Sequence, residues 1–226
     1  MADLRANFET ACTGILVLLA VGLSGNYVFD RALARTGDSI EQYGVEPQQV
    51  DGWQQENARG VWMGPADAPV VVTEFMDFQC PYCARLVYRM DTLHTEHPGR
   101  IATVFHHFPL SNHPFAVPAA IAGECAYQQG RFAELHRLIF EKQDSLGVKT
   151  WDSYAKEAQV PDLARFGLCV LQPADSFPRI AYGRALGERT GVRGTPHIWI
   201  NGRAIRRSDM RALRAWTSEI LAQASR

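Results

Sequence analysis

The chain lacks an excess of charge of either sign: 23 Lys and Arg residues stand against 24 Asp and Glu residues in 226, for a net charge of −1. A protein that binds nucleic acid usually carries a basic excess, so this composition gives no reason to expect a nucleic-acid partner. Internal repeats and low-complexity tracts are also missing from the sequence. With 46% hydrophobic residues, the sequence is typical of an ordinary globular protein.

Cysteine is scarce, and the spacing of the cysteines argues against a structural zinc site. Among five cysteines there is a single Cys-x-x-Cys motif, Cys80 to Cys83. A structural zinc site needs four ligands, and a second pair at matching spacing is missing. Histidines would have to complete the site, and the candidates are His106, His107 and His113. This alternative stays open, but we expect no metal ion and interpret the motif as a redox pair.

Charged residues are absent between Glu9 and Asp30. As a helix, the 20 residues Thr10–Phe29 are long enough to span roughly 30 Å of hydrocarbon. We interpret residues 1–30 as a membrane anchor, because the preceding stretch is not basic and a small-x-small cleavage site appears only beyond Asp30. A cleaved signal peptide and a soluble amphipathic tail are the alternatives.

The Cys-x-x-Cys motif lies where a strand is expected to end and a helix to begin. Val70–Thr73 is an apolar, β-branched run, and apolar residues recur at helical spacing between 84 and 94. Unpaired N–H groups at a helix start favour an anion, so Cys80 is expected to form a thiolate easily. Pro81 suits the first helical position, and Cys83 is close enough to form a disulfide with Cys80. A stabilised thiolate weakens that disulfide and so favours an oxidant.

A second stretch far down the chain, residues 191–202, contains Thr195 and Pro196. Together with residues 74–83, it closely resembles the thioredoxin superfamily, in which the segment before a cis-proline packs against the Cys-x-x-Cys motif. The resemblance implies that Pro196 is the cis-proline and Thr195 the residue before it. It also implies that Glu74 is the buried acid that handles the proton of the resolving cysteine. The alternatives are that Glu74 faces solvent on an edge strand and that Pro196 is a trans proline in a turn.

Each of these roles also has a physical reason. Burial in an apolar strand would raise the pKa of Glu74 towards the range that is useful for proton transfer. Proline has no N–H group to compete for the facing sulfur, and the backbone beside it can pair with an extended substrate peptide. We therefore expect the substrate to be bound around Pro81, Tyr82, Thr195 and Pro196.

Residues 114–188 have the pattern of several consecutive helices. A helical segment of this length between two thioredoxin halves resembles the DsbA-like branch, the extracytoplasmic disulfide oxidoreductases. Three short runs also resemble sequences of this branch: His106–Leu110, His113-Pro114 and Cys125–Phe132. The expected fold class is α/β: a thioredoxin fold in residues 60–226 with an inserted α-helical domain at about 114–188. An N-terminal transmembrane helix and a polar linker, residues 31–59, precede it.

Cys125 and Cys169 lie on two of the expected helices. Apart from Cys12 in the membrane span, the chain has four cysteines, an even number that allows two disulfides. We predict a structural Cys125–Cys169 bond, with two buried free thiols as the first alternative and a second redox pair as the other. Further along, Asn201-Gly202 predicts a two-residue β-hairpin, and the last helix is expected to begin near Ser208-Asp209.

These expectations describe a membrane-anchored protein thiol-disulfide oxidoreductase with its catalytic domain in the periplasm or another extracytoplasmic space. The resemblance implies an oxidase that introduces disulfides into unfolded or exported cysteine-containing proteins. It also implies reoxidation by a quinone-linked membrane protein of the DsbB or vitamin K epoxide reductase type, without a bound cofactor. A disulfide reductase or isomerase of the same fold is one alternative. A non-catalytic, chaperone-like module that binds peptides around Pro196 is the alternative from another class.

Overall fold

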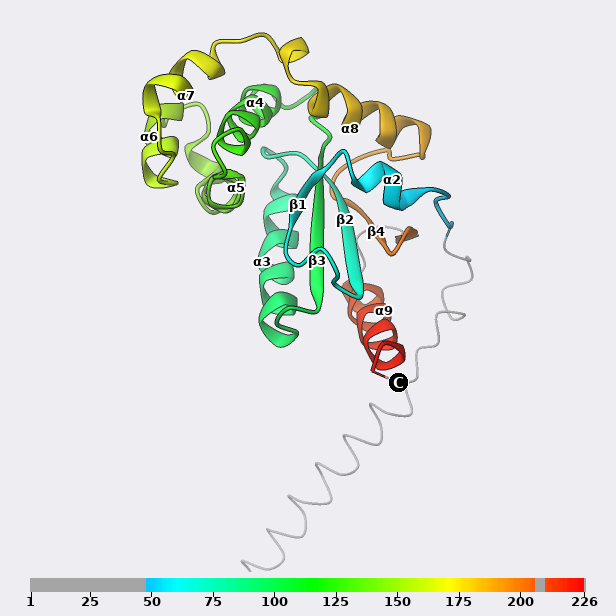
Figure 1. Cartoon of the computed structure of the whole chain (residues 1–226). Coiled ribbons are helices and arrows are strands. Elements are labelled where there is room, and N and C mark those ends of the chain that lie inside the picture. Colours follow the sequence, from blue (N-terminus) through cyan, green and yellow to red (C-terminus); the bar gives the residue numbers. More distant parts are fainter. Residues whose placement is uncertain (1–47, 206–209, 226) are drawn as a thin grey trace, which may run out of the picture. The chain divides into compact units, whose positions relative to one another are not determined.

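The central strand of the sheet is β2 (Val70–Met76) (Figure 1), and all of its residues are buried. The computed structural model describes residues 48–205 and 210–225, and within them five strands form one sheet in the order β1-β3-β2-β4-β5. On either side of β2 lie β3 (Ile101–His107), which is parallel to it, and β4 (His197–Ile200), which is antiparallel. The outer strands are β1 (Val61–Met63) and β5 (Arg203–Ile205). Helices cover both faces of β2, which explains why its sequence is an almost continuous apolar run.

Alternate residues of β2 face two different layers of helices. Glu74 faces a cavity that is also lined by α3 (Pro81–Glu96) and α5 (Phe132–Glu141). Phe75 faces the other way, into a core cluster that includes Leu186 of α8 (Pro178–Arg189) and Trp199 of β4. The sheet therefore separates α3 from α8, and the carboxyl end of β2 leads directly into the start of α3.

The polar stretch before β1 packs against the sheet. The backbone N–H of Val50 donates to the carbonyl oxygen of Gly202 at 2.8 Å. The ring of Trp53, in the short helix α2 (Trp53–Asn57), covers Gly202 so closely that a Cβ atom there would lie 2.2 Å from it. Residues 48–59 therefore belong to the same compact unit as the sheet, and the short helix α2 lies within the stretch expected to be a linker. Trp53 is the aromatic side chain that anchors this otherwise polar stretch to the sheet.

The helical insertion lies between β3 and β4. Four of its helices, α4 (Ala116–Tyr127), α5, α6 (Trp151–Glu157) and α7 (Leu163–Val170), cluster at one end of the sheet (Figure 1). Two single turns, η2 (Gln143–Ser145) and η3 (Ala174–Ser176), connect them to each other and to α8. In contrast, α8 packs along β3, where a Cβ on Gly183 would lie 2.3 Å from the carbonyl oxygen of His107. The predicted insertion thus consists of a helical cluster, α4 to α7, followed by a helix that covers the sheet.

Two of the expectations fall outside the described residues. These are the membrane span Thr10–Phe29, with Cys12 in it, and the start of the last helix at Ser208-Asp209. Within the described ranges, none of the helices combines the length and the apolar character needed to cross a membrane. The last helix, α9 (Met210–Gln223), buries Leu213 and Trp216.

Candidate active site at the start of helix α3

The cysteine motif lies at the junction between β2 and α3. Cys80 is the N-cap of α3 and Pro81 is its first residue. The first turn is closed by the N–H of Cys83, which donates to the carbonyl oxygen of Cys80 at 3.0 Å. Both cysteines are free thiols, 3% and 0% exposed respectively, whereas Tyr82 between them is 61% exposed. The helix start therefore holds two sulfurs beneath a surface formed by exposed Pro81 and Tyr82.

The two sulfurs differ in acidity. A hydrogen bond from the Cys83 thiol lowers the pKa of Cys80 to about 6, with smaller contributions from Thr195 and from the N–H groups of Cys83 and Tyr82, although partial burial opposes the shift. Burial, followed by the interaction with Cys80, raises the pKa of Cys83 well above its ordinary value. The helix start thus provides one thiolate and one thiol at neutral pH.

Thr195 and Pro196 lie opposite Cys80. The Sγ atom of Cys80 lies 3.3 Å from the carbonyl oxygen of Thr195, to which Cys80 donates when it is protonated. The peptide bond between Thr195 and Pro196 is cis, so the alternative of an ordinary trans turn is wrong. Both residues are half-buried, and with Pro81 and Tyr82 they surround Cys80 from two segments that are distant in the sequence.

Glu74 is a buried acid on the central strand, so the alternative of an exposed edge-strand position is wrong. Burial, and to a smaller extent the negative charge of Asp91, raises the pKa of Glu74 to about 8. Its Oε1 atom has no hydrogen-bond partner among the described residues. A carboxyl group that keeps its proton at neutral pH is suited to general acid chemistry.

A cavity of about 450 Å³ adjoins Glu74 between the sheet, α3 and α5. Its rim carries the ion pair of Asp91 and Arg137, 2.8 Å apart. Burial lowers the pKa of His136, on the cavity wall, to about 3, so this side chain is neutral at pH 7. Val87, one helical turn beyond Cys83, also lines the cavity, which therefore approaches Cys83 from the inner side of α3.

The three histidines considered as zinc ligands contact different partners. The Nε2 atom of His107 lies 3.0 Å from Glu124 Oε1, and the Nδ1 atom of His113 lies 2.8 Å from Asp77 Oδ2. His106 stacks on an aromatic ring of the core. Among the residues that the structure describes, no three potential ligands are grouped so as to hold a metal ion.

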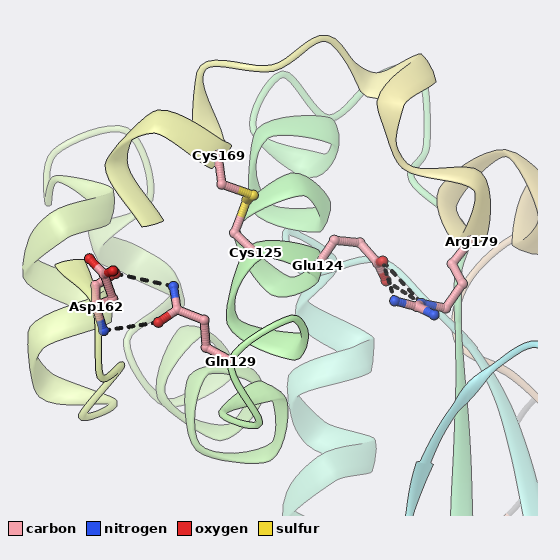
Figure 2. Close-up of a disulfide and its surroundings, with 6 residues drawn as sticks. All are labelled: Glu124, Cys125, Gln129, Asp162, Cys169 and Arg179. Carbon is pink, nitrogen blue, oxygen red and sulfur yellow. Dashed lines mark hydrogen bonds and ion pairs between the residues drawn. A yellow bond between two sulfur atoms is a disulfide. The ribbon is translucent and has the colours of Figure 1, made fainter. Parts of the chain in front are cut away.

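Cys125 and Cys169 form a disulfide between α4 and α7 (Figure 2). The bond lies inside the helical insertion, spans 44 positions of sequence and involves a Cys125 that is 1% exposed. Nearby, the side-chain amide of Gln129 makes two hydrogen bonds to the backbone of Asp162, at 2.9 and 3.1 Å. These links connect the end of α4 to the beginning of α7, and they leave Cys80 and Cys83 as the free thiols of the described residues.

A buried ion cluster that the sequence analysis did not single out joins the insertion to the sheet. Arg179 of α8 donates from Nε to both carboxylate oxygens of Glu124 at 3.0 Å (Figure 2), and His107 at the end of β3 contacts the same carboxylate. Burial opposes ionisation, but these two partners hold the pKa of Glu124 below its usual value. The available signal was a lone acidic residue in the otherwise apolar helix α4.

Comparison with known protein families identifies the family of the chain. The sequence profile of the family described as Thioredoxin matches residues 56–218, more than half of the chain. The chain therefore belongs to this thioredoxin family, and its architecture is that of the DsbA-like members of the superfamily.

Three solved structures illustrate the shared fold. BdbD from Bacillus subtilis has a TM-score of 0.63 and 20% identity, and the match covers 79% of this chain and 98% of that one. The thiol-disulfide exchange protein alpha-DsbA2 from Wolbachia pipientis gives 0.61 and 17%, covering 76% and 100%. MdbA, a thiol-disulfide oxidoreductase from Corynebacterium diphtheriae, gives 0.58 and 16%, covering 72% and 89%. At these identities the likeness defines the fold.

The curated relatives are longer proteins. Na(+)/H(+) antiporter NhaA 3 of Salinispora tropica is 37% identical over 141 residues, which make up 62% of this chain and 21% of that protein. Na(+)/H(+) antiporter NhaA of Herminiimonas arsenicoxydans is 29% identical over 199 residues, 88% of this chain and 31% of that protein. The chain thus spans only a minor part of the relatives it matches.

Proposed function

We propose that the chain is a protein thiol-disulfide oxidoreductase in which Cys80 is the attacking sulfur and Cys83 the resolving sulfur. The observation that carries this proposal is the position of the two sulfurs, Cys80 as the N-cap of α3 and Cys83 in its first turn. In this position the pKa of Cys80 is lowered to about 6, so that the thiolate predominates at pH 7, whereas Cys83 keeps its proton. The sulfur with the lower pKa is both the nucleophile of the reduced pair and the better leaving group of a mixed disulfide, so the bond to substrate forms and breaks at Cys80.

The forward reaction is the oxidation of a substrate dithiol. A substrate thiolate attacks the Cys80 sulfur of the Cys80–Cys83 disulfide, the enzyme's S–S bond breaks, and Cys83 leaves as a thiolate. Glu74 supplies the proton that Cys83 takes up. A second substrate thiolate then attacks the substrate sulfur of the mixed disulfide, and Cys80 leaves as a stabilised thiolate. The substrate loses two electrons to the enzyme, which ends as a dithiol.

The same pKa supports one direction of the reaction, the oxidation of the substrate. Stabilising the Cys80 thiolate stabilises the reduced enzyme, which makes the disulfide a stronger oxidant. This favours an oxidase over a reductase, which needs a more stable disulfide.

The surface around Cys80 is suited to an extended polypeptide. Tyr82 offers an exposed aromatic ring, and Pro196, next to the Thr195 carbonyl, provides no N–H that would compete for sulfur. A peptide can pair with exposed backbone at this position while its sulfur faces Cys80. We infer that the substrates are unfolded or exported proteins that contain cysteines.

An extracytoplasmic location is consistent with this chemistry, because disulfides such as Cys125–Cys169 persist in oxidising compartments. A neighbour in fold from Salmonella enterica is described as a periplasmic thioredoxin-like protein. We infer a periplasmic catalytic domain, tethered by residues 1–30 and reoxidised by a quinone-linked membrane protein of the DsbB or vitamin K epoxide reductase type. Ion transport, named for the antiporter relatives, concerns proteins several times longer than the shared segment, and we do not assign it to this chain.

The decisive experiment is an equilibrium titration of the Cys80–Cys83 pair against glutathione buffers. An oxidase is expected to equilibrate nearer to the potential of about −120 mV typical of a strong oxidant than to the −270 mV of thioredoxin. A value near that of thioredoxin would instead assign the chain to the reductases.

A second assay separates enzymes from binding modules. Reduced, unfolded ribonuclease is incubated with the oxidised full chain, with its Cys80→Ser, Cys83→Ser double variant and with a Cys125→Ala, Cys169→Ala double variant. We expect loss of disulfide transfer in the first variant and retention in the second. Undiminished activity of the first variant would leave the chaperone-like alternative as the better explanation.

A further inference from the structure

The loop that precedes Cys80 is held by a buried carboxylate. The side chain of Asp77 is 0% exposed. Its Oδ1 accepts a hydrogen bond from the N–H of Gln79 at 2.7 Å. Its Oδ2 accepts one from the N–H of Leu110 at 2.9 Å and lies 2.8 Å from Nδ1 of His113. One side chain thus joins the loop of the cysteine motif to the segment that enters the helical insertion.

The insertion also contacts the loop through two amide side chains. Gln143, in η2, donates from Nε2 to the carbonyl oxygens of Phe78 at 2.7 Å and of Cys80 at 3.0 Å. In the opposite direction, Oε1 of Gln79 accepts the N–H of Phe115, the N-cap of α4, at 2.7 Å. These contacts satisfy backbone groups that burial would otherwise leave without a partner.

The carbonyl that Gln143 contacts belongs to the helix start. The oxygen of Cys80 also accepts the N–H groups of Cys83 at 3.0 Å and Ala84 at 3.3 Å. The Cys83 thiol contributes most to the lowered pKa of Cys80, and the N–H groups of Cys83 and Tyr82 in the same turn add to it. A hydrogen bond that fixes the Cys80 carbonyl therefore fixes the direction of the donors that stabilise its thiolate.

We propose that Gln143 and His113 are positioning residues of the redox pair, through which the helical insertion holds residues 77–80 and sets the reactivity of Cys80. The proposal rests on the redox function of Cys80 and Cys83 and assigns a second task to the insertion. Neither residue contacts a cysteine sulfur, so each acts through the backbone of the loop. The four α-helices at the end of the sheet then help to set the reactivity of the Cys80 thiol.

The chain offers a matched control for Gln143. Gln129 also makes two hydrogen bonds to backbone atoms within the insertion, but its partner is Asp162, at the start of α7 (Figure 2). Gln143→Leu and Gln129→Leu each remove two amide hydrogen bonds at a half-buried position. Only the first substitution releases the Cys80 carbonyl.

The readout is the rate at which iodoacetamide alkylates Cys80 at pH 6, resolved by peptide mass spectrometry on the reduced full chain. We expect Gln143→Leu to slow alkylation by about 3- to 10-fold, the effect of losing one or two hydrogen bonds, and to move the pH midpoint upward. Gln129→Leu is expected to leave both quantities unchanged. Equal behaviour of the two variants would overturn the role of Gln143.

His113 is tested by rescue. In His113→Asn, the side-chain amide nitrogen occupies nearly the place of Nδ1 and can still donate to Asp77, whereas His113→Ala removes the donor. We expect the alanine variant to show the upward shift of the Cys80 midpoint and the asparagine variant to restore it. An alanine variant with the wild-type midpoint, or an asparagine variant that matches alanine, would contradict the role of His113.

Failure of this inference is distinguishable from failure of the redox function. If Cys80→Ser abolishes disulfide transfer while Gln143→Leu and His113→Ala leave the Cys80 midpoint unchanged, the enzyme stands and the positioning role falls. If Cys80→Ser retains transfer, the redox proposal falls first.

Discussion

The thiol of Cys80 lies 3.3 Å from the carbonyl oxygen of Thr195, although 115 positions separate the two residues in the sequence. The pairing of two strands produces this contact. In the antiparallel ladder of β2 and β4, Phe75 is opposite His197, so the end of one strand lies beside the start of the other. Cys80 follows β2 and Thr195 precedes β4. Because of the sheet register, both residues therefore lie at the same end of these two strands.

The acidity of Cys80 predicts a specific pH profile of reactivity. In the reduced full chain, alkylation of Cys80 by iodoacetamide should have its midpoint near pH 6. Replacing Cys83 with Ala removes the hydrogen bond that contributes most to this low pKa, so the midpoint should rise. Peptide mass spectrometry separates Cys80 from the other cysteines. A midpoint near 9.0, the ordinary value of a thiol, would contradict the proposed nucleophile.

The start of α3 could be predicted from sequence because it depends on local patterns. The β-branched run at residues 70–73 and the helical spacing from 84 onward place the junction, and Pro81 marks the first turn. The position of Pro196 opposite Cys80 depends on strand pairing across the whole domain, and only resemblance to a known family indicated it. Local spacing carries no information about such a contact.

The polar contacts of the site were beyond the reach of sequence patterns. Gln143 and Asp77 belong to residue types that are usually solvated, and their partners are backbone atoms of distant residues. Because every residue has a backbone carbonyl, the sequence does not indicate which carbonyl a side chain such as Gln143 will contact. The contact between Trp53 and Gly202 was unpredictable for a similar reason, because Trp53 is one aromatic residue in a polar stretch and the contact depends on the β4–β5 turn.

Glu74 predicts a pH dependence of stability. The pKa of Glu74 in the folded protein, about 8, is above the ordinary 4.5, so its contribution to stability is fully present below pH 4.5 and is lost as the pH rises through 8. Glu74→Gln cannot ionise and should abolish this loss. Urea unfolding at pH 5 and pH 8.5 measures it: the wild type should lose several kcal/mol more than the variant, since one pKa unit corresponds to about 1.4 kcal/mol.

The same variant tests the proton-transfer role. Without an acid, Cys83 must take its proton from water, so disulfide transfer by Glu74→Gln should be slower at neutral pH. Asp91→Asn is the companion variant, because removal of this charge should lower the pKa of Glu74 without removing the acid.

The stability measurements also test whether Glu74 is protonated in the folded protein. Stability curves of wild type and Glu74→Gln that run parallel from pH 5 to 8.5 would show that Glu74 is ionised throughout.

The Cys125–Cys169 bond should stabilise the insertion without taking part in exchange. It closes a loop of 44 positions, and a bond of this kind typically contributes about 2–4 kcal/mol. Denaturant unfolding of the Cys125→Ala, Cys169→Ala variant should show a loss of this size, and a reductant should destabilise the wild type but not the variant. Equal unfolding midpoints of the two oxidised proteins would mean that the bond contributes nothing to folding.

The buried carboxylate of Glu124 should be needed to hold the insertion on the sheet. Glu124→Ala leaves His107 and Arg179 without their shared partner, and removing one member of a buried ion pair typically costs about 3–5 kcal/mol. Since Arg179 is 30% exposed, we expect a loss near the lower end of that range. Glu134→Ala in α5 is the control, because it breaks an exposed pair with Arg131 that should contribute less than about 1 kcal/mol.

The effect of Glu124→Ala should also depend on pH in a defined direction. The pKa of Glu124 is held below 4.5 in the folded protein, so its contribution is present above pH 4.5 and is lost as the pH falls through the lowered value. The stability difference between wild type and Glu124→Ala, measured by urea unfolding, should therefore shrink as the pH falls from 4.5 to 3. A difference that persists unchanged at pH 3 would show that packing of the side chain, rather than its charge, joins α4 to α8 and β3.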